Sequence, residues 1–244
     1  MEIRRFASSD AAAAAAVARI VEVVRRKPQA VLGLPAGQTM VPVYAEIVRL
    51  ARAAPSEWAR VRAFQVDEFV GLGHGDVGSF RSFLERTLLD ELRLDANQVA
   101  FLNGKASDTH AECERYERVI AQAGGLDLQL LGIGANGHIG FNEPGDALTA
   151  RTHLATLHAK TRRANAVWFE NDLSRVPHQA FSMGMATLLG ARAVVLVATG
   201  ESKAEAVARA VTGSLSTQLP ASFLQLHAAA EFYLDAAAAK GLAT

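Results

Sequence analysis

The sequence has few of the features that indicate a disulfide-stabilised protein, a membrane protein or a protein that binds a polyanion. Its 244 residues include a single cysteine, Cys113, so an internal disulfide is excluded, and no Cys or His neighbour stands at metal-ligand spacing. The 25 basic and 25 acidic side chains balance, which gives no electrostatic case for nucleic acid or an anionic membrane as partner. The N-terminus lacks a signal-peptide pattern, and the alanine run 11–16 is too short to span a bilayer. We therefore expect a cytoplasmic protein.

Half of the residues are apolar, and the length suits one domain over residues 1–244. Apolar runs of strand length alternate with helical patterns. Strands are expected at 29–34, 61–66, 99–102, 126–133, 193–200 and 231–237. Helices are expected from Ser9 or Asp10 to about Lys27, and over 41–54, 79–92 and 107–123. This alternation predicts an α/β fold with a Rossmann-like, doubly wound, mostly parallel sheet flanked by helices.

Ligands of such sheets bind beyond the carboxyl ends of the strands. This rule selects the loops 35–40, 67–79, 132–145 and 200–203. In the first loop, Gly37 and Thr39 stand between a strand and a helix, where backbone N–H groups and the helix dipole favour a phosphate. The loop is not a Walker A motif, and an ordinary tight turn remains the alternative. In the last loop, Lys203 is placed to meet an anion, or else follows a capping serine at the surface.

The second loop begins with the acidic pair Asp67-Glu68 at a strand end. Successive side chains of a strand face opposite ways, so only one of the two need point into a site. A partly desolvated carboxylate can act as a general base. The alternative is a solvated pair at the end of the strand.

The third loop carries the segment GIGANGHIGFNEPG, residues 132–145. It contains G-x-G-x-x-G, but a dinucleotide site is rejected because the motif lies mid-chain and Pro144 soon blocks a regular helix. His138 and Glu143 lie five residues apart and can fold toward each other, as a proton-transfer histidine and the carboxylate that fixes its tautomer. Asn136 and Asn142 accompany them. No third ligand stands out for a metal.

No G-x-S-x-G motif indicates a nucleophilic serine. The remaining chemistry is proton transfer on a phosphorylated small molecule with no cofactor required, as in aldose–ketose isomerisation.

The chain resembles the glucosamine-6-phosphate deaminase family, within a wider group that includes 6-phosphogluconolactonases and galactosamine-6-phosphate isomerases. The resemblance runs from about Pro28 to His227. It rests on VLGLPAGQT, VDEFVGL, LQLLGIGANGHIGFNEPG, TRRAN, GESKAEAV and PASFLQLH. GHIGFNEPG is the most discriminating stretch, because the lactonase branch does not carry its Asn-Glu-Pro.

The resemblance implies conversion of glucosamine 6-phosphate and water to fructose 6-phosphate and ammonia, with no metal or nucleotide. The matching motif implies that Asp67 is the base that moves a proton between C2 and C1. His138 serves ring opening, with Glu143 and Asn136 orienting and polarising it. The implied phosphate ligands are Ala36, Gly37, Gln38, Thr39 and Lys203.

The chain departs from the family pattern on the phosphate side. Gln38 replaces a glycine of the usual Thr-Gly-Gly-Thr loop, and Val167 stands where an arginine is expected. We hypothesise that Arg163, four residues earlier on the same helix face, supplies the missing cation. The residues that bind an allosteric activator in hexameric members appear here as His153 and Ala155. The resemblance therefore argues for a monomer or small homo-oligomer and against a hexamer, and it marks 146–176 as a lid region.

Three alternatives stay open. A galactosamine-6-phosphate enzyme is the nearest alternative, because the departures at Gln38 and Val167 affect how the substrate fits. A 6-phosphogluconolactonase-like hydrolase is disfavoured by Asn142-Glu143-Pro144. A non-catalytic sugar-phosphate sensor of a transcription regulator is disfavoured because one helix precedes the first expected strand, which leaves no room for a helix-turn-helix.

Overall fold

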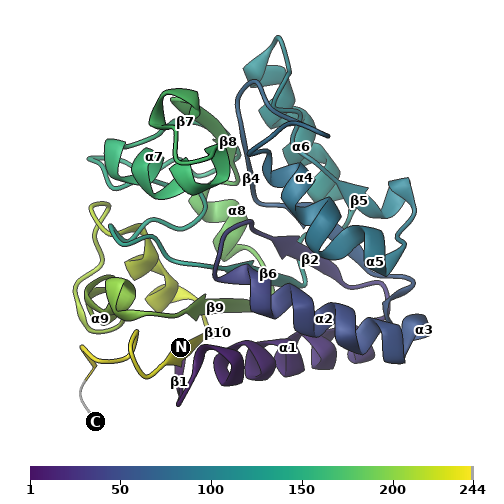
Figure 1. The fold of residues 1–244 in the computed structure, drawn as a ribbon, viewed down its shortest axis with the longest axis horizontal. Coiled ribbons are helices and arrows are strands. Elements are labelled where there is room, and N and C mark those ends of the chain that lie inside the picture. Colours follow the sequence, from purple (N-terminus) through teal and green to yellow (C-terminus); the bar gives the residue numbers. More distant parts are fainter. Residues whose placement is uncertain (243–244) are drawn as a thin grey trace.

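A parallel β-sheet forms the centre of the computed structural model, which describes residues 1–242 (Figure 1). Among these residues, seven strands pair in the order β1-β10-β9-β6-β2-β3-β5, and all six pairings are parallel. Their bounds are β1 Glu2–Phe6, β2 Val31–Leu34, β3 Arg62–Gln65, β5 Val99–Ala100, β6 Leu128–Leu131, β9 Val194–Ala198 and β10 Ala230–Asp235. Strand order reverses direction between β2 and β6, so the sheet is doubly wound, as the sequence predicts.

Helices cover both faces of this sheet. One face carries α1 (Ser9–Arg26), α2 (Met40–Ala53), α3 (Pro55–Trp58) and the continuous run α4 (Phe80–Leu84), η1 (Glu85–Leu89, a π-helical turn) and α5 (Asp90–Leu92). The other face carries α6 (Thr109–Gln122), α8 (Met185–Leu189), α9 (Ala204–Thr212) and the 3₁₀ helix η6 (Pro220–Leu226). Within residues 1–242, no helix is both long and apolar enough to cross a bilayer.

The apolar runs of the sequence become strands that are buried on both faces. In β9, Val194 and Leu196 join the core under α6 and α9, while Val195 and Val197 join the core under α1 and α2. Alternate side chains of a strand point to opposite faces, so two helix-covered faces demand a continuous apolar run.

The expected helix starts are confirmed to within a residue or two. The Ser8 hydroxyl accepts a hydrogen bond from Ala11 N, and the Asp108 carboxylate accepts one from Ala111 N. Each cap satisfies a backbone donor that the first turn leaves free.

A second, antiparallel sheet corrects the sequence prediction, which treats 67–79 as loop throughout. Its order is β4 (Asp67–Phe69), β8 (Gln179–Ser182) and β7 (His153–Thr156). With α7 (Ala159–Asn165) and the 3₁₀ helices η3 (Ala166–Phe169) and η4 (Leu173–Arg175), it forms the unit at the upper left of Figure 1. These strands are three or four residues long and pair with partners far along the chain, so periodicity does not reveal them.

The edge strand β1 is also absent from the sequence prediction. It reads Glu-Ile-Arg-Arg-Phe, with no fully buried side chain. It pairs on one side only, with β10. Exposure of an edge strand allows a polar composition that carries no strand signal.

Candidate active site

A cavity of about 350 Å³ opens at the carboxyl ends of β2 and β6, where the strand order reverses. Each of the four loops selected from the sequence contributes residues to the lining of this cavity. The lining residues in or next to these loops are 35–40, Asp67, Phe80, 132–136, His138, Gly140, Phe141 and Lys203. The volume is in the range of small-molecule sites. A fifth contribution, which the loop rule does not foresee, comes from α7 and η3.

The loop between β2 and α2 offers unused donors to this cavity. The N–H groups of Gly37, Gln38 and Thr39 donate no hydrogen bond within the described residues, and the Thr39 side chain does not cap α2. Gly37 has φ +126°, which side-chain-bearing residues rarely adopt. The dipole of the 14-residue helix α2 adds positive potential. The free N–H groups and the helix dipole together favour the binding of an anion at this segment.

Lys203 reaches the same cavity from the opposite half of the sheet. It ends the 3₁₀ helix η5 (Glu201–Lys203) after Gly200, whose N–H donates to both carboxylate oxygens of Asp235 at 3.1 and 3.0 Å. Asp235 ends β10, so the neighbouring strand fixes the loop that presents the lysine. Burial, followed by repulsion from Lys160, lowers the pKa of Lys203.

Asp67 lies in the cavity wall as a buried carboxylate with an unused oxygen. Its side chain is 5% exposed, and Oδ1 is buried with no hydrogen-bond partner among the described residues. Burial, reinforced by the neighbouring charge of Glu68, raises the pKa of Asp67 well above the usual aspartate range. A desolvated, unpaired carboxylate facing a cavity has the properties of a general base.

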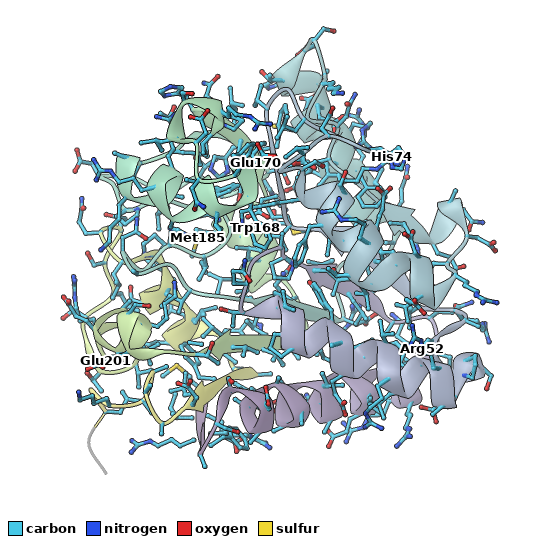
Figure 2. The ribbon with its side chains drawn as sticks, in the orientation of Figure 1. Arg52, His74, Trp168, Glu170, Met185 and Glu201 are labelled. Atoms are coloured by element: carbon cyan, nitrogen blue, oxygen red, sulfur yellow. The ribbon has the colours of Figure 1, made fainter. Side chains whose placement is uncertain are left out.

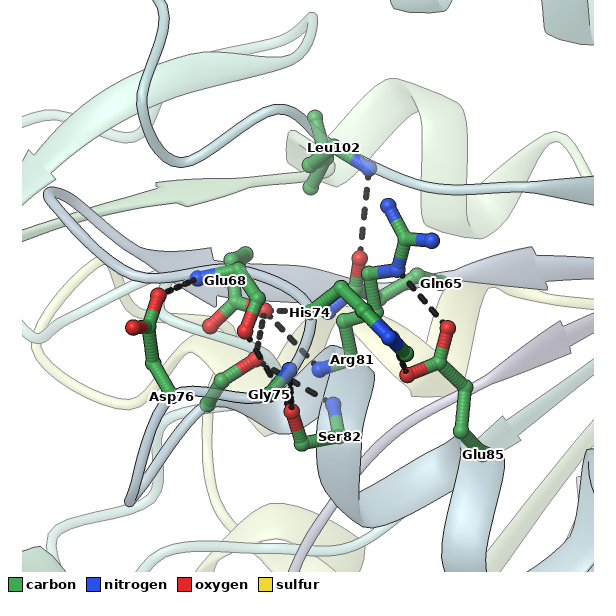
Figure 3. Close-up of polar contacts among 11 residues, drawn as sticks. Gln65, Glu68, His74, Gly75, Asp76, Arg81, Ser82, Glu85 and Leu102 are labelled. Carbon is green, nitrogen blue, oxygen red and sulfur yellow. Dashed lines mark hydrogen bonds and ion pairs between the residues drawn. The ribbon is translucent and has the colours of Figure 1, made fainter.

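Glu68 does not line the cavity that Asp67 lines, as expected for neighbours on a strand. Its carboxylate is held by five donors, and Figure 3 shows part of this network around Glu68. Phe69 N and Phe80 N donate to Oε1, while Arg81 N, the Ser79 hydroxyl and Gln65 Nε2 donate to Oε2. Burial raises the pKa of this carboxyl and the hydrogen bonds oppose the rise. Glu68 therefore ties the strand carrying Asp67 to the start of α4, which carries Phe80 into the cavity wall.

Glu68→Ala is expected to lower the free energy of unfolding by about 3 kcal/mol or more, because it leaves buried donors without an acceptor. Urea titration measures the loss. The matched control is Glu91→Ala, which removes an exposed ion pair with Arg52 and should cost less than about 1 kcal/mol. Equal losses in the two variants would contradict the anchoring role of Glu68.

His138, Glu143 and Asn136 form the hydrogen-bonded group that the sequence predicts. His138 Nδ1 lies 3.5 Å from Glu143 Oε2 and 3.3 Å from the Thr161 hydroxyl. Asn136 Nδ2 donates to Glu143 Oε2 at 2.9 Å, and His158 N donates to Oε1 at 3.1 Å. Burial alone would raise the pKa of Glu143, but His138, Thr161 and Asn136 lower it to about 2. Glu143 is thus an anion that orients an imidazole in the cavity wall.

Gly134 has a packing role in this group. A β-carbon on Gly134 would lie 2.4 Å from Cε1 of His138, and Gly134 N donates to the His138 carbonyl. Gly134 therefore leaves room for the imidazole.

Arg163 is not brought to the cavity. It is exposed on α7, and the cavity is lined instead by Lys160, Thr161, Ala164, Asn165 and Val167. The helix tightens to 3₁₀ geometry at Ala166, with three residues per turn, so Val167 shares a face with Ala164 and not with Arg163. The spacing argument assumed an uninterrupted α-helix. Lys160 is the cation of this segment that the sequence analysis missed, since three cations in one polar helix give no sign of which faces inward.

Aromatic rings close the side of the cavity. Trp168, labelled near the middle of Figure 2, packs edge-on against Phe83 of α4 with ring centroids 5.2 Å apart. Phe80 and Phe141 stack at 5.7 Å and line the cavity with Trp168. These rings join the α7 unit to α4 and form an apolar wall of the cavity that Asp67 also lines.

The site therefore combines a buried carboxylate, an oriented imidazole, free backbone donors and two lysines. This set can move protons on a small, phosphorylated molecule.

Comparison with known proteins agrees with this chemistry. The sequence model described as "Glucosamine-6-phosphate isomerases/6-phosphogluconolactonase" matches residues 4–233. Glucosamine-6-phosphate deaminase 1 of Giardia intestinalis is 47% identical over 222 residues, which cover 91% of this chain and 84% of the relative. The structure of a monomeric glucosamine-6-phosphate deaminase superposes with a TM-score of 0.95 at 35% identity, covering 99% of this chain and all of the other. The 6-phosphogluconolactonase of Trypanosoma brucei shares the fold, with a TM-score of 0.78 at 19% identity, covering 99% of this chain and 98% of that one.

Proposed function

The chain belongs to the family of glucosamine-6-phosphate isomerases and 6-phosphogluconolactonases, and within it we propose that the cavity deaminates glucosamine 6-phosphate to fructose 6-phosphate and ammonia. The chain is an enzyme of the glucosamine-6-phosphate deaminase type. The observation that supports the reaction is that one small cavity is lined by the His138 side of the His138–Glu143 group and by a buried Asp67, whose Oδ1 has no hydrogen-bond partner among residues 1–242.

Ring opening is assigned to His138. The reaction needs a proton delivered to the ring oxygen and one taken from the anomeric hydroxyl, and an imidazole can do both near neutral pH. Glu143 and Thr161 face Nδ1, which leaves Nε2 for the sugar. Asn136 holds Glu143 through its amide and accepts a hydrogen bond from His138 N.

Isomerisation is assigned to Asp67. In the open-chain sugar, its carboxylate takes the proton from C2 while the carbonyl oxygen at C1 takes up a proton, so that the electron pair forms the C1–C2 enol. A proton returned to C1 leaves an iminium at C2. Water adds to C2, ammonia departs, and the ketone of fructose 6-phosphate remains. The raised pKa makes Asp67 a stronger base toward a carbon acid than an exposed aspartate.

The phosphate is assigned to the segment 36–39 and Lys203. The free N–H groups of Gly37, Gln38 and Thr39 and the ammonium of Lys203 supply donors and positive charge on one side of the cavity. Holding the phosphate there fixes the reacting carbons relative to Asp67 and His138.

The galactosamine 6-phosphate reaction is the second candidate. The residues that depart from the family pattern, Gln38 and Val167, both line the cavity and so touch substrate fit. Asp67, His138 and Glu143 would serve either sugar equally, because the two differ only at C4.

We further propose a cytoplasmic enzyme that works as a monomer or small homo-oligomer, with 146–176 as a lid. The helices α7 and η3 of that segment form one wall of the cavity. The monomeric state of the deaminase with the similar structure supports the smaller assembly.

Ammonia release tests the substrate. With both sugars at equal concentration, glucosamine 6-phosphate is expected to give ammonia and fructose 6-phosphate in equal amounts, at a kcat/KM at least about tenfold above that for galactosamine 6-phosphate. A reversed preference would assign the galactosamine reaction. Hydrolysis of 6-phosphogluconolactone without ammonia release from either amino sugar would overturn the proposed function.

A further inference from the structure

We propose that Lys160 is a second phosphate-binding cation of this cavity and takes the place left by the missing arginine at Val167. The identity of the substrate in this inference rests on the proposed function. The binding of an anion by Lys160 rests on the geometry of the cavity alone. It replaces the hypothesis that Arg163 compensates.

Lys160 and Lys203 face the same cavity from separate elements. Lys160 stands on α7 and Lys203 at the end of η5, and both line the cavity with Gly37 and Thr39. The ammonium of Lys160 donates to the carbonyl of Ala135 at 3.4 Å, which holds it over the loop that carries His138. The two charges are close enough that Lys160 lowers the pKa of Lys203.

Neither lysine has a counter-ion within residues 1–242, whereas Lys27, Lys105 and Lys240 each form an ion pair with a carboxylate. Two ammonium groups that repel each other beside free backbone donors are stabilised by a ligand with two negative charges. A phosphate monoester meets that requirement.

The neighbouring arginines are occupied or turned away. The guanidinium of Arg162 donates to the carbonyls of Val176 and Leu173, which fixes it against η4. Arg163 is exposed and does not line the cavity. Among the cations on α7, Lys160 is therefore the one that the structure presents to an anion.

The test compares Lys160→Met with Lys160→Arg and with the matched control Arg163→Met, at constant ionic strength. Lys160→Met is expected to raise KM for glucosamine 6-phosphate by about 5- to 30-fold with kcat within about twofold, because it removes one charge-assisted hydrogen bond to a group that does not react. Lys160→Arg should restore most of the loss. Arg163→Met should leave KM unchanged.

Binding of inorganic phosphate, measured by calorimetry, separates this inference from the proposed function. Weaker phosphate binding by Lys160→Met supports the role of Lys160 even if the unmodified protein releases no ammonia, an outcome that would refute only the reaction. Unchanged phosphate affinity in Lys160→Met overturns the inference, whatever the activity. The inference would also be overturned if Arg163→Met raised KM as much as Lys160→Met does.

Discussion

Asp67→Asn is expected to lower kcat by about 10³-fold while KM for glucosamine 6-phosphate changes little. The amide keeps the shape of the side chain but cannot accept the proton from C2, and a general base contributes on the order of 10²–10⁴-fold. Loss of an interaction made only in the transition state lowers kcat and kcat/KM together. Steady-state ammonia release measures both constants.

The same substitution is expected to stabilise the fold. Asp67 is buried beside Glu68 and its Oδ1 finds no partner in the described part of the chain, so its charge costs folding free energy. Because the folded-state pKa is raised, stability falls as pH rises from the unfolded value of about 4 through the folded one. Asp67→Asn should therefore raise Tm, by about 2–4 °C for each kcal/mol recovered, and the gain should be larger at pH 8 than at pH 5.

The matched control is Asp76→Asn, a carboxylate-to-amide change on the loop that follows Asp67. Asp76 pairs with Lys105 at the surface, so the variant should keep near-full kcat and lose a little stability. If Asp67→Asn lowers Tm and kcat together, the residue is structural and the assignment of the base fails.

His138→Gln is the second large effect, with kcat expected to fall by about 10²-fold. Glutamine keeps a polar group but cannot cycle a proton between the ring oxygen and the anomeric hydroxyl. Glu143→Gln should reduce kcat less, about tenfold. The carboxylate, whose pKa is lowered to about 2, stays charged and orients the imidazole, and a neutral amide does this less well.

His110→Gln serves as the control for the histidine. His110 is exposed on α6, outside the cavity, and its loss should not change either kinetic constant. A kcat that Glu143→Gln leaves unchanged would mean that the carboxylate does not act through His138.

The sequence predicts the large sheet and the centre of the site because both rest on local patterns. Continuous apolar runs such as 193–200 indicate doubly covered strands, and the carboxyl-end rule then brings Gly37, Asp67, His138 and Lys203 to one edge. The alternation of side chains in a strand likewise separates Asp67 from Glu68, as the structure confirms.

The parts that sequence reasoning missed depend on distant contacts. The strands β4, β7 and β8 are short and form only through their mutual pairing. The face of α7 that lines the cavity carries Lys160, Thr161, Ala164 and Asn165, and tertiary packing decides which face of this polar helix turns inward. Lys160 lies on that face and Arg163 does not, while the 3₁₀ geometry from Ala166 onward brings Val167 to the same side as Ala164.

The most direct measurement of the central claim follows deuterium into fructose 6-phosphate. Glucosamine 6-phosphate carrying deuterium at C2 is turned over in D₂O, so that any proton moved through Asp67 arrives at C1 as deuterium, whether transferred internally or exchanged with solvent. The account predicts one deuterium at C1, in a single configuration by NMR, with ammonia formed in equal amount and almost no product from Asp67→Asn. Ammonia release that leaves C1 free of deuterium, or product formed as fast by Asp67→Asn, would contradict it.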